Sequence, residues 1–130
     1  MDDTPVALDT NVVIRLTKGD LQIAERLTNV PTLLLPSPVA GELLFGALNS
    51  PRPAFHWPRE RAFIAGLSVL AADLSAAEHY AEIRLALKQR GRPIPENDMW
   101  IAAICRAHDV QLFTLDKHFG EVPGLRLVSA

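Results

Sequence analysis

The chain of 130 residues contains a single cysteine, and it lacks any apolar run long enough to cross a membrane. Cys105 cannot form a disulfide within the chain, and it falls inside an apolar stretch with helical spacing. We interpret it as a small core residue in a reducing compartment rather than a reactive thiol. Met1–Asp3 is not followed by the basic and apolar segments of a secretion signal. These absences predict a soluble, cytoplasmic protein with no membrane partner.

A large excess of either charge is also missing. Thirteen basic and fifteen acidic side chains give a formal net charge of −2, which argues against nucleic-acid binding through bulk positive charge. Any such binding needs a local patch, and Arg84, Lys88 and Arg92 recur every four residues along a predicted helix. This row fits weak contacts to RNA phosphates, although a solvated helix face explains the same spacing.

Strand-like and helix-like segments alternate along the chain, and no repeat or low-complexity segment interrupts them. Strands are predicted at residues 5–8, 32–35, 69–72, 109–115 and 125–128. The longest predicted helix opens at Ser75, with Glu78 completing a capping box. We expect one α/β domain over residues 1–130, with a mostly parallel central sheet flanked by helices in three α/β/α layers.

Residues 49–58 are rich in proline and include Phe55, His56 and Trp57. The segment is predicted to be a loop that precedes a short helix at 59–67. It is either a connector whose aromatic rings pack on the core, or a lid that covers a site or meets a partner.

Four acidic residues stand where a parallel sheet would bring them together. Asp9 and Asp116 follow predicted strands, whereas Glu42 and Asp98 fall in the first turns of predicted helices, and all four positions lie at the carboxyl edge of such a sheet. Each acid also has a structural explanation as a cap, a helix-start charge or an exposed residue. As a group, however, four carboxylates repel one another unless a cation is present, and hard oxygen ligands select Mg²⁺ or Mn²⁺.

The motifs around these acids resemble the acidic signature of PIN-domain ribonucleases, and the length is similar to that of small VapC-type toxins of toxin–antitoxin pairs. The matching residues are Leu8-Asp9-Thr10-Asn11, Glu42, Asn97-Asp98 and Thr114-Leu-Asp116. The resemblance implies that the four acids bind one or two Mg²⁺ or Mn²⁺ ions, supported by Thr10, Asn11 and Thr114. It also implies a PIN-like fold and a homodimeric endoribonuclease that cuts single-stranded regions of RNA and is silenced by an antitoxin. Glu96 lies outside the signature.

Other classes of protein fit less well. A phosphoacceptor receiver domain needs adjacent acids after its first strand, whereas Asp2 and Asp3 precede the strand here. A haloacid-dehalogenase-type phosphatase needs an aspartate where this chain has Asn11. A PIN-like module that binds RNA or a partner without cutting remains an alternative. His108 and His118 receive no role at this point.

Overall fold

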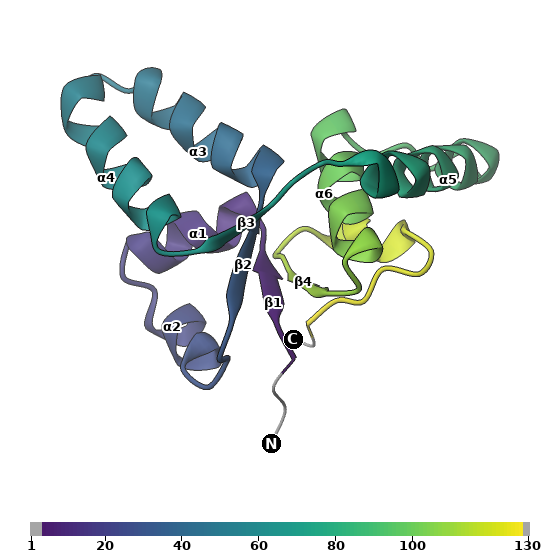
Figure 1. Cartoon of the computed structure of the whole chain (residues 1–130), viewed down its shortest axis with the longest axis horizontal. Coiled ribbons are helices and arrows are strands. Elements are labelled where there is room, and N and C mark those ends of the chain that lie inside the picture. The colour runs from purple at the N-terminus through teal and green to yellow at the C-terminus, as the bar shows by residue number, and fades with distance from the viewer. Residues whose placement is uncertain (1–3, 129–130) are drawn as a thin grey trace.

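The computed structural model describes residues 4–128 and has a four-stranded parallel sheet at its centre (Figure 1). β1 (Val6–Leu8) lies between β2 (Leu33–Pro36) and β4 (Gln111–Phe113), and β3 (Ser68–Leu70) pairs with the other side of β2. Met1–Asp3, on which the expectations about a secretion signal and a receiver domain rest, lies outside the described residues.

Helices flank this sheet on both sides, which confirms the predicted three-layer α/β arrangement. They are α1 (Thr10–Thr17), α2 (Leu21–Leu27), α3 (Ser37–Leu48), α4 (Pro53–Ala65), α5 (Leu74–Arg90), α6 (Glu96–Ala107) and the 3-10 helix η1 (Lys117–Glu121). In the view of Figure 1, α1 to α4 lie to the left of the strands, and α5 and α6 lie to the right. Between residues 4 and 128, no helix combines the length and the apolar character that a membrane crossing requires.

β1 and much of α6 are buried in the core. The strand is buried along its whole length, and Ala7 pairs with Leu34 on one side and with Leu112 on the other. A strand covered on both faces is apolar throughout, which explains the uninterrupted run of apolar residues in the sequence. Residues 101–105 of α6 are fully buried and include Cys105, a free thiol as expected. The elements that lead to Asp9 and Asp98 are therefore firmly fixed by packing.

The prediction of a loop at 49–58 is wrong from Pro53 onward, because α4 begins there. Proline is well tolerated in a first helical turn, where its missing N–H would have no partner within the helix. Pro58 lies inside the helix, where it removes one backbone hydrogen bond. Packing of α4 on α3 and the burial of Ile64 compensate for this loss. Phe55 lies under the guanidinium groups of Arg52 and Arg59, at 4.5 and 5.0 Å from its ring centroid.

The start of α5 differs from its prediction, and α6 starts without a side-chain cap. The carboxylate of Asp73, rather than Ser75, caps α5 by accepting a hydrogen bond from the Ala76 amide at 3.0 Å. Pro95 precedes the first residue of α6, so Asn97 lies within the first turn and is not the cap. The side chain of Asn97 is consequently available for a tertiary contact.

The predicted last strand at 125–128 is reduced to an isolated bridge between Leu127 and Leu112. The amide of Leu112 donates to the Arg126 carbonyl at 2.9 Å, and the Val128 amide donates to the Leu112 carbonyl at 3.0 Å. The alternation of apolar residues is real, but these few bonds do not extend into a ladder. This segment covers the edge of β4, which would otherwise present unpaired backbone groups.

Candidate metal centre

Asp9 connects the end of β1 with the start of α1. Its Oδ1 accepts a hydrogen bond from the Thr10 amide at 2.9 Å, so Asp9 is the N-cap of α1. Its Oδ2 accepts a hydrogen bond from the Thr114 hydroxyl at 2.7 Å. Asp9 is only 3% exposed, and burial raises the pKa of its carboxyl above the ordinary value. The nearby charges of Asp98 and Asp116 also raise this pKa, whereas the two hydrogen bonds lower it.

Asp98 is the third residue of α6, and its side chain is 16% exposed. Its Oδ2 lies 2.7 Å from Nε2 of His118, on the segment that follows β4. Burial is the main cause that raises the pKa of the Asp98 carboxyl, and Asp116 adds to it. The contact with His118 acts in the opposite direction. The side chain of Asp98 is thus directed toward His118 and is largely shielded from solvent.

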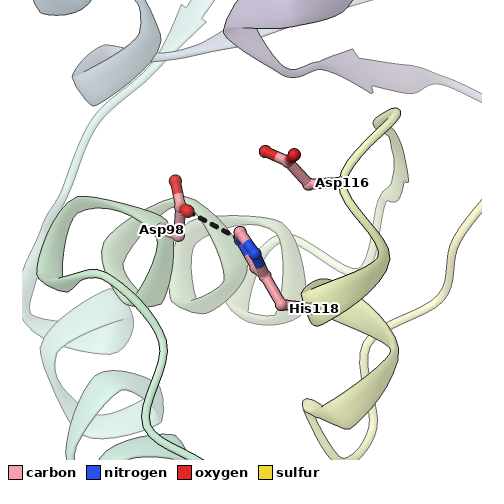
Figure 2. Close-up of side chains that lie close together, drawn as sticks. All are labelled: Asp98, Asp116 and His118. Carbon is pink, nitrogen blue, oxygen red and sulfur yellow. Dashed lines mark hydrogen bonds and ion pairs between the residues drawn. The ribbon is translucent and has the colours of Figure 1, made fainter.

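Asp116 completes a compact cluster with these two residues. One ligand atom from each of Asp98, Asp116 and His118 can be chosen so that all three lie within 4.8 Å of one another. Figure 2 shows the two carboxylates and the imidazole facing a common space, with Asp98 on α6 and the other two on the segment after β4. Asp116 is exposed, and its amide donates to the Thr114 hydroxyl at 3.0 Å. Thr114 therefore links Asp116 to Asp9.

Glu42 is tied to the same region through a different contact. The side-chain amide of Asn97 donates to Glu42 Oε1 at 2.6 Å, which joins α3 to the first turn of α6 next to Asp98. Glu42 is exposed and is not a member of the compact cluster. It lines a cleft of about 410 Å³ between α1, α3 and α4, together with Thr10.

The supporting residues Thr10, Asn11 and Thr114 all lie at this edge of the sheet. Asn11 Oδ1 accepts a hydrogen bond from the Leu115 amide at 3.4 Å, and Thr114 bridges two of the acids. Thr10 Oγ1 is buried and has no hydrogen-bond partner in the structure. A buried hydroxyl without a partner is uncommon and is a point where a water or a ligand can bind.

Sequence reasoning missed His118. A histidine in a short polar segment has no periodicity that distinguishes it from a surface residue, and its partner lies 20 positions earlier. The available signal was its place two residues after Asp116 and immediately before Phe119. Phe119 is fully buried and anchors η1, so the neighbouring ring is held close to the acids.

The basic row on α5 is only partly available to a ligand. Arg84 donates to the Tyr80 hydroxyl at 2.8 Å and lies 3.8 Å from the Glu96 carboxylate, which also contacts Tyr80. Glu96, outside the acidic signature, is thus engaged with α5. Lys88 is exposed and lines a hollow of about 320 Å³ together with Arg84 and Met99. Arg92 is exposed just beyond the end of the helix.

The donor set fits a hard divalent cation. Carboxylate oxygens are the protein ligands that Mg²⁺ and Mn²⁺ prefer, and Asp98 and Asp116 each offer one within 4.8 Å of the other. The raised pKa values of Asp9 and Asp98 have the same origin, since burial and mutual repulsion both disfavour the charged forms. A bound cation would relieve both effects.

Comparison with known proteins agrees with this architecture. The PIN domain family model matches residues 6–125. The chain is 32% identical over 122 residues to the tRNA(fMet)-specific endonuclease VapC of Shigella flexneri, covering 92% of each chain. The chain therefore belongs to the PIN domain family and, within it, to the VapC ribonucleases.

Solved structures show the same relationship. VapBC-1 from nontypeable Haemophilus influenzae has a TM-score of 0.89 at 28% identity, with 96% of this chain and 97% of the other covered. VapBC-5 from Mycobacterium tuberculosis, a member of the VapBC family of toxin–antitoxin systems, has a TM-score of 0.74 at 26% identity. That match covers 96% of this chain and 99% of the other.

Proposed function

We propose that this protein is a Mg²⁺- or Mn²⁺-dependent endoribonuclease that cleaves single-stranded regions of RNA and acts as the toxin of a toxin–antitoxin pair. The observation that carries the proposal is the convergence of Asp9, Asp98 and Asp116 from three separate elements at one edge of the sheet. Asp98 and Asp116 both raise the pKa of Asp9, and Asp116 also raises the pKa of Asp98. Such an arrangement is unfavourable for the metal-free fold, and a role in binding a cation explains it.

In this proposal Asp9, Glu42, Asp98 and Asp116 hold one or two cations. A divalent cation supplies the chemistry by lowering the pKa of a water and by neutralising charge that develops on the phosphoryl oxygens. The carboxylates of Asp98 and Asp116 face a common space (Figure 2). Asp9 is buried, and its two hydrogen bonds fix its orientation. Glu42 accepts a hydrogen bond from Asn97, the neighbour of Asp98.

The surrounding residues would support substrate binding. Thr114 keeps Asp9 and Asp116 at a fixed separation, Asn11 fixes the backbone at Leu115, and Thr10 offers an unpartnered hydroxyl at the cleft. Exposed Lys88 and Arg92 on the α5 side can attract the RNA backbone despite the net charge of −2. No side-chain nucleophile is required in this scheme.

The relatives also support a proposal for the assembly in the cell. Relatives solved as VapBC complexes support an antitoxin as the protein partner. We further propose that the protein forms a homodimer, that residues 1–130 act as one domain, and that it works in the cytoplasm, where RNA is available.

The decisive experiment is an RNA cleavage assay with Mg²⁺, with Mn²⁺ and with EDTA. The matched control is Asp116→Asn, because Asp116 is exposed and its replacement should leave the fold intact. Cleavage by the parent in either metal, and none in EDTA or by the variant, is expected. Cleavage by the parent that persists in EDTA, with the variant inactive, would refute the metal mechanism. RNA binding without cleavage in any metal would favour the non-cutting module.

A further inference from the structure

His118 is the cluster member to which the proposed function gives no role. It belongs to η1, its side chain is 34% exposed, and its Nε2 lies 2.7 Å from Asp98 Oδ2 (Figure 2). An ionised carboxylate can only accept a hydrogen bond, so the imidazole donates through Nε2. This contact connects the segment after β4 with the first turn of α6.

The hydrogen bond restricts a carboxylate that the backbone alone would leave free to rotate. The terminal torsion of aspartate is broad, so a place in the first turn of α6 does not fix the plane of the Asp98 carboxylate. With Oδ2 engaged by His118, Oδ1 remains the oxygen that a cation can use. Among residues 4–128, no other side-chain hydrogen bond or ion pair to Asp98 is found.

We propose that His118 is a positioning residue for the cation site, which holds the Asp98 carboxylate in the orientation that binds the metal. This role rests on the proposed function. Carboxylates that ligate metals are commonly oriented by hydrogen bonds from outside the coordination sphere. The buried side chain of Phe119, whose ring centroid is 4.9 Å from that of His118, gives the imidazole a fixed base.

The hydrogen bond to Asp98 favours positioning over direct ligation when Nε2 of His118 carries the proton. A ring nitrogen that carries the proton of a hydrogen bond has no lone pair for a cation. Moreover, Asp116 and His118 stand two residues apart on one segment, so this segment would supply one ligand and align a second. The arrangement couples the two carboxylates through one short segment.

The test compares two substitutions of similar size in the full chain. His118→Leu fills the space beside Phe119 but has no donor, whereas His118→Gln retains an N–H group at similar reach. His108→Ala, at the exposed far end of α6, is the matched control. Mn²⁺ and Mg²⁺ binding is measured by titration calorimetry at one pH, and thermal unfolding in EDTA checks that each variant is folded.

We expect His118→Leu to bind Mn²⁺ about 10- to 100-fold more weakly, as is typical for the loss of such a hydrogen bond. His118→Gln should stay within a few-fold of the parent, and His108→Ala should match it. Equal affinity of the Leu variant and the parent would overturn the positioning role. Binding by Gln as weak as by Leu, with a changed ratio of Mn²⁺ to Mg²⁺ affinity, would also overturn it and would indicate direct ligation. If the parent itself binds neither metal, the proposed function fails as well.

Discussion

Asp9 and Asp116 occupy comparable places in the chain, near the ends of two adjacent strands, but their surroundings differ. Asp9 is buried and accepts two hydrogen bonds, one of which caps α1. Asp116 is exposed, and its backbone amide donates to the Thr114 hydroxyl. The same residue type at the same edge of the sheet is therefore part of the architecture in one case and is available for chemistry in the other. Substitutions can separate these two contributions.

The largest effect is expected for Asp9→Ala in EDTA. It removes the cap of α1 and leaves the half-buried Thr114 hydroxyl without its acceptor, so the free energy of unfolding should fall by about 2 to 4 kcal/mol. Asp116→Ala should change it by less than about 0.5 kcal/mol, as is usual for an exposed side chain. Urea denaturation of both variants at one pH measures the difference. Equal losses would mean that the contrast in burial has no energetic consequence.

Substitutions of Asp9 and of Asp116 should reduce metal binding to a similar extent. Mn²⁺ at 100 times its Kd should stabilise the parent by about 2.7 kcal/mol, because it binds the native state alone. Asp9→Asn and Asp116→Asn should both lose most of this gain, although Asn can retain hydrogen bonds at either position. Thermal melts with EDTA and with saturating Mn²⁺ give the required values. A full gain in either variant would remove that residue from the proposed ligand set.

The pH dependence of the metal-free protein should also distinguish the two positions. The pKa of Asp9 is raised from its ordinary value of 3.8, chiefly by burial, so the folded state binds more protons than the unfolded state in the window above 3.8. The stabilisation is thus complete below this window and is lost as the pH rises through the folded pKa. Asp9→Asn should flatten this decline. Asp116→Asn should flatten it less, because it acts only through the repulsion felt by Asp9 and Asp98. Denaturation in EDTA from pH 4 upward measures the slopes, and identical slopes in all three proteins would contradict the assignment.

The smallest effect concerns the cations of α5, where the same contrast recurs. Arg84 is engaged by Tyr80 and Glu96, whereas Lys88 is exposed and has no ion-pair partner within residues 4–128. If Lys88 contacts RNA phosphates, Lys88→Glu should weaken RNA binding and make the salt dependence shallower by about 1 in the logarithmic slope. Its affinity for Mn²⁺ should not change. Arg61→Glu, on the exposed side of α4, is the control. An unchanged slope for the Lys88 variant would identify the row as a solvated face.

The sequence was most informative where one physical requirement dominates. The runs at 5–8 and 32–35 are apolar because both faces of these strands are covered, and they were placed correctly. Helical periodicity places Asp98 on the same helix face as Ile101 and Cys105, which are fully buried. The sequence therefore indicates the side of α6 on which the Asp98 carboxylate lies. The location of Asp9 and Asp116 at one edge of the sheet could be predicted, because the carboxyl ends of parallel strands meet there.

Features that depend on tertiary contacts could not be predicted in this way. Local rules for proline favour a loop around Pro58, whereas packing against α3 maintains a helix. Asparagine is a residue type that often caps helices. The side-chain amide of Asn97 instead donates to Glu42, 55 positions earlier in the sequence. The role of His118 depends on its contact with Asp98. In each case the partner is remote in sequence, and no local pattern encodes it.

Because Cys105 is buried, the reactivity of its thiol can be used to follow unfolding of the protein. The thiol is fully enclosed, and burial, with a smaller contribution from the charge of Asp9, raises its pKa to about 12. Alkylating reagents attack the thiolate, so the folded protein should resist them at neutral pH. Labelling then requires α6 to separate from the sheet, and its rate follows the population of the opened state. Because the chain has one cysteine, mass spectrometry of a single adduct gives the labelling rate. The effect of a cation, an RNA or an antitoxin on this rate measures how far each of them suppresses opening.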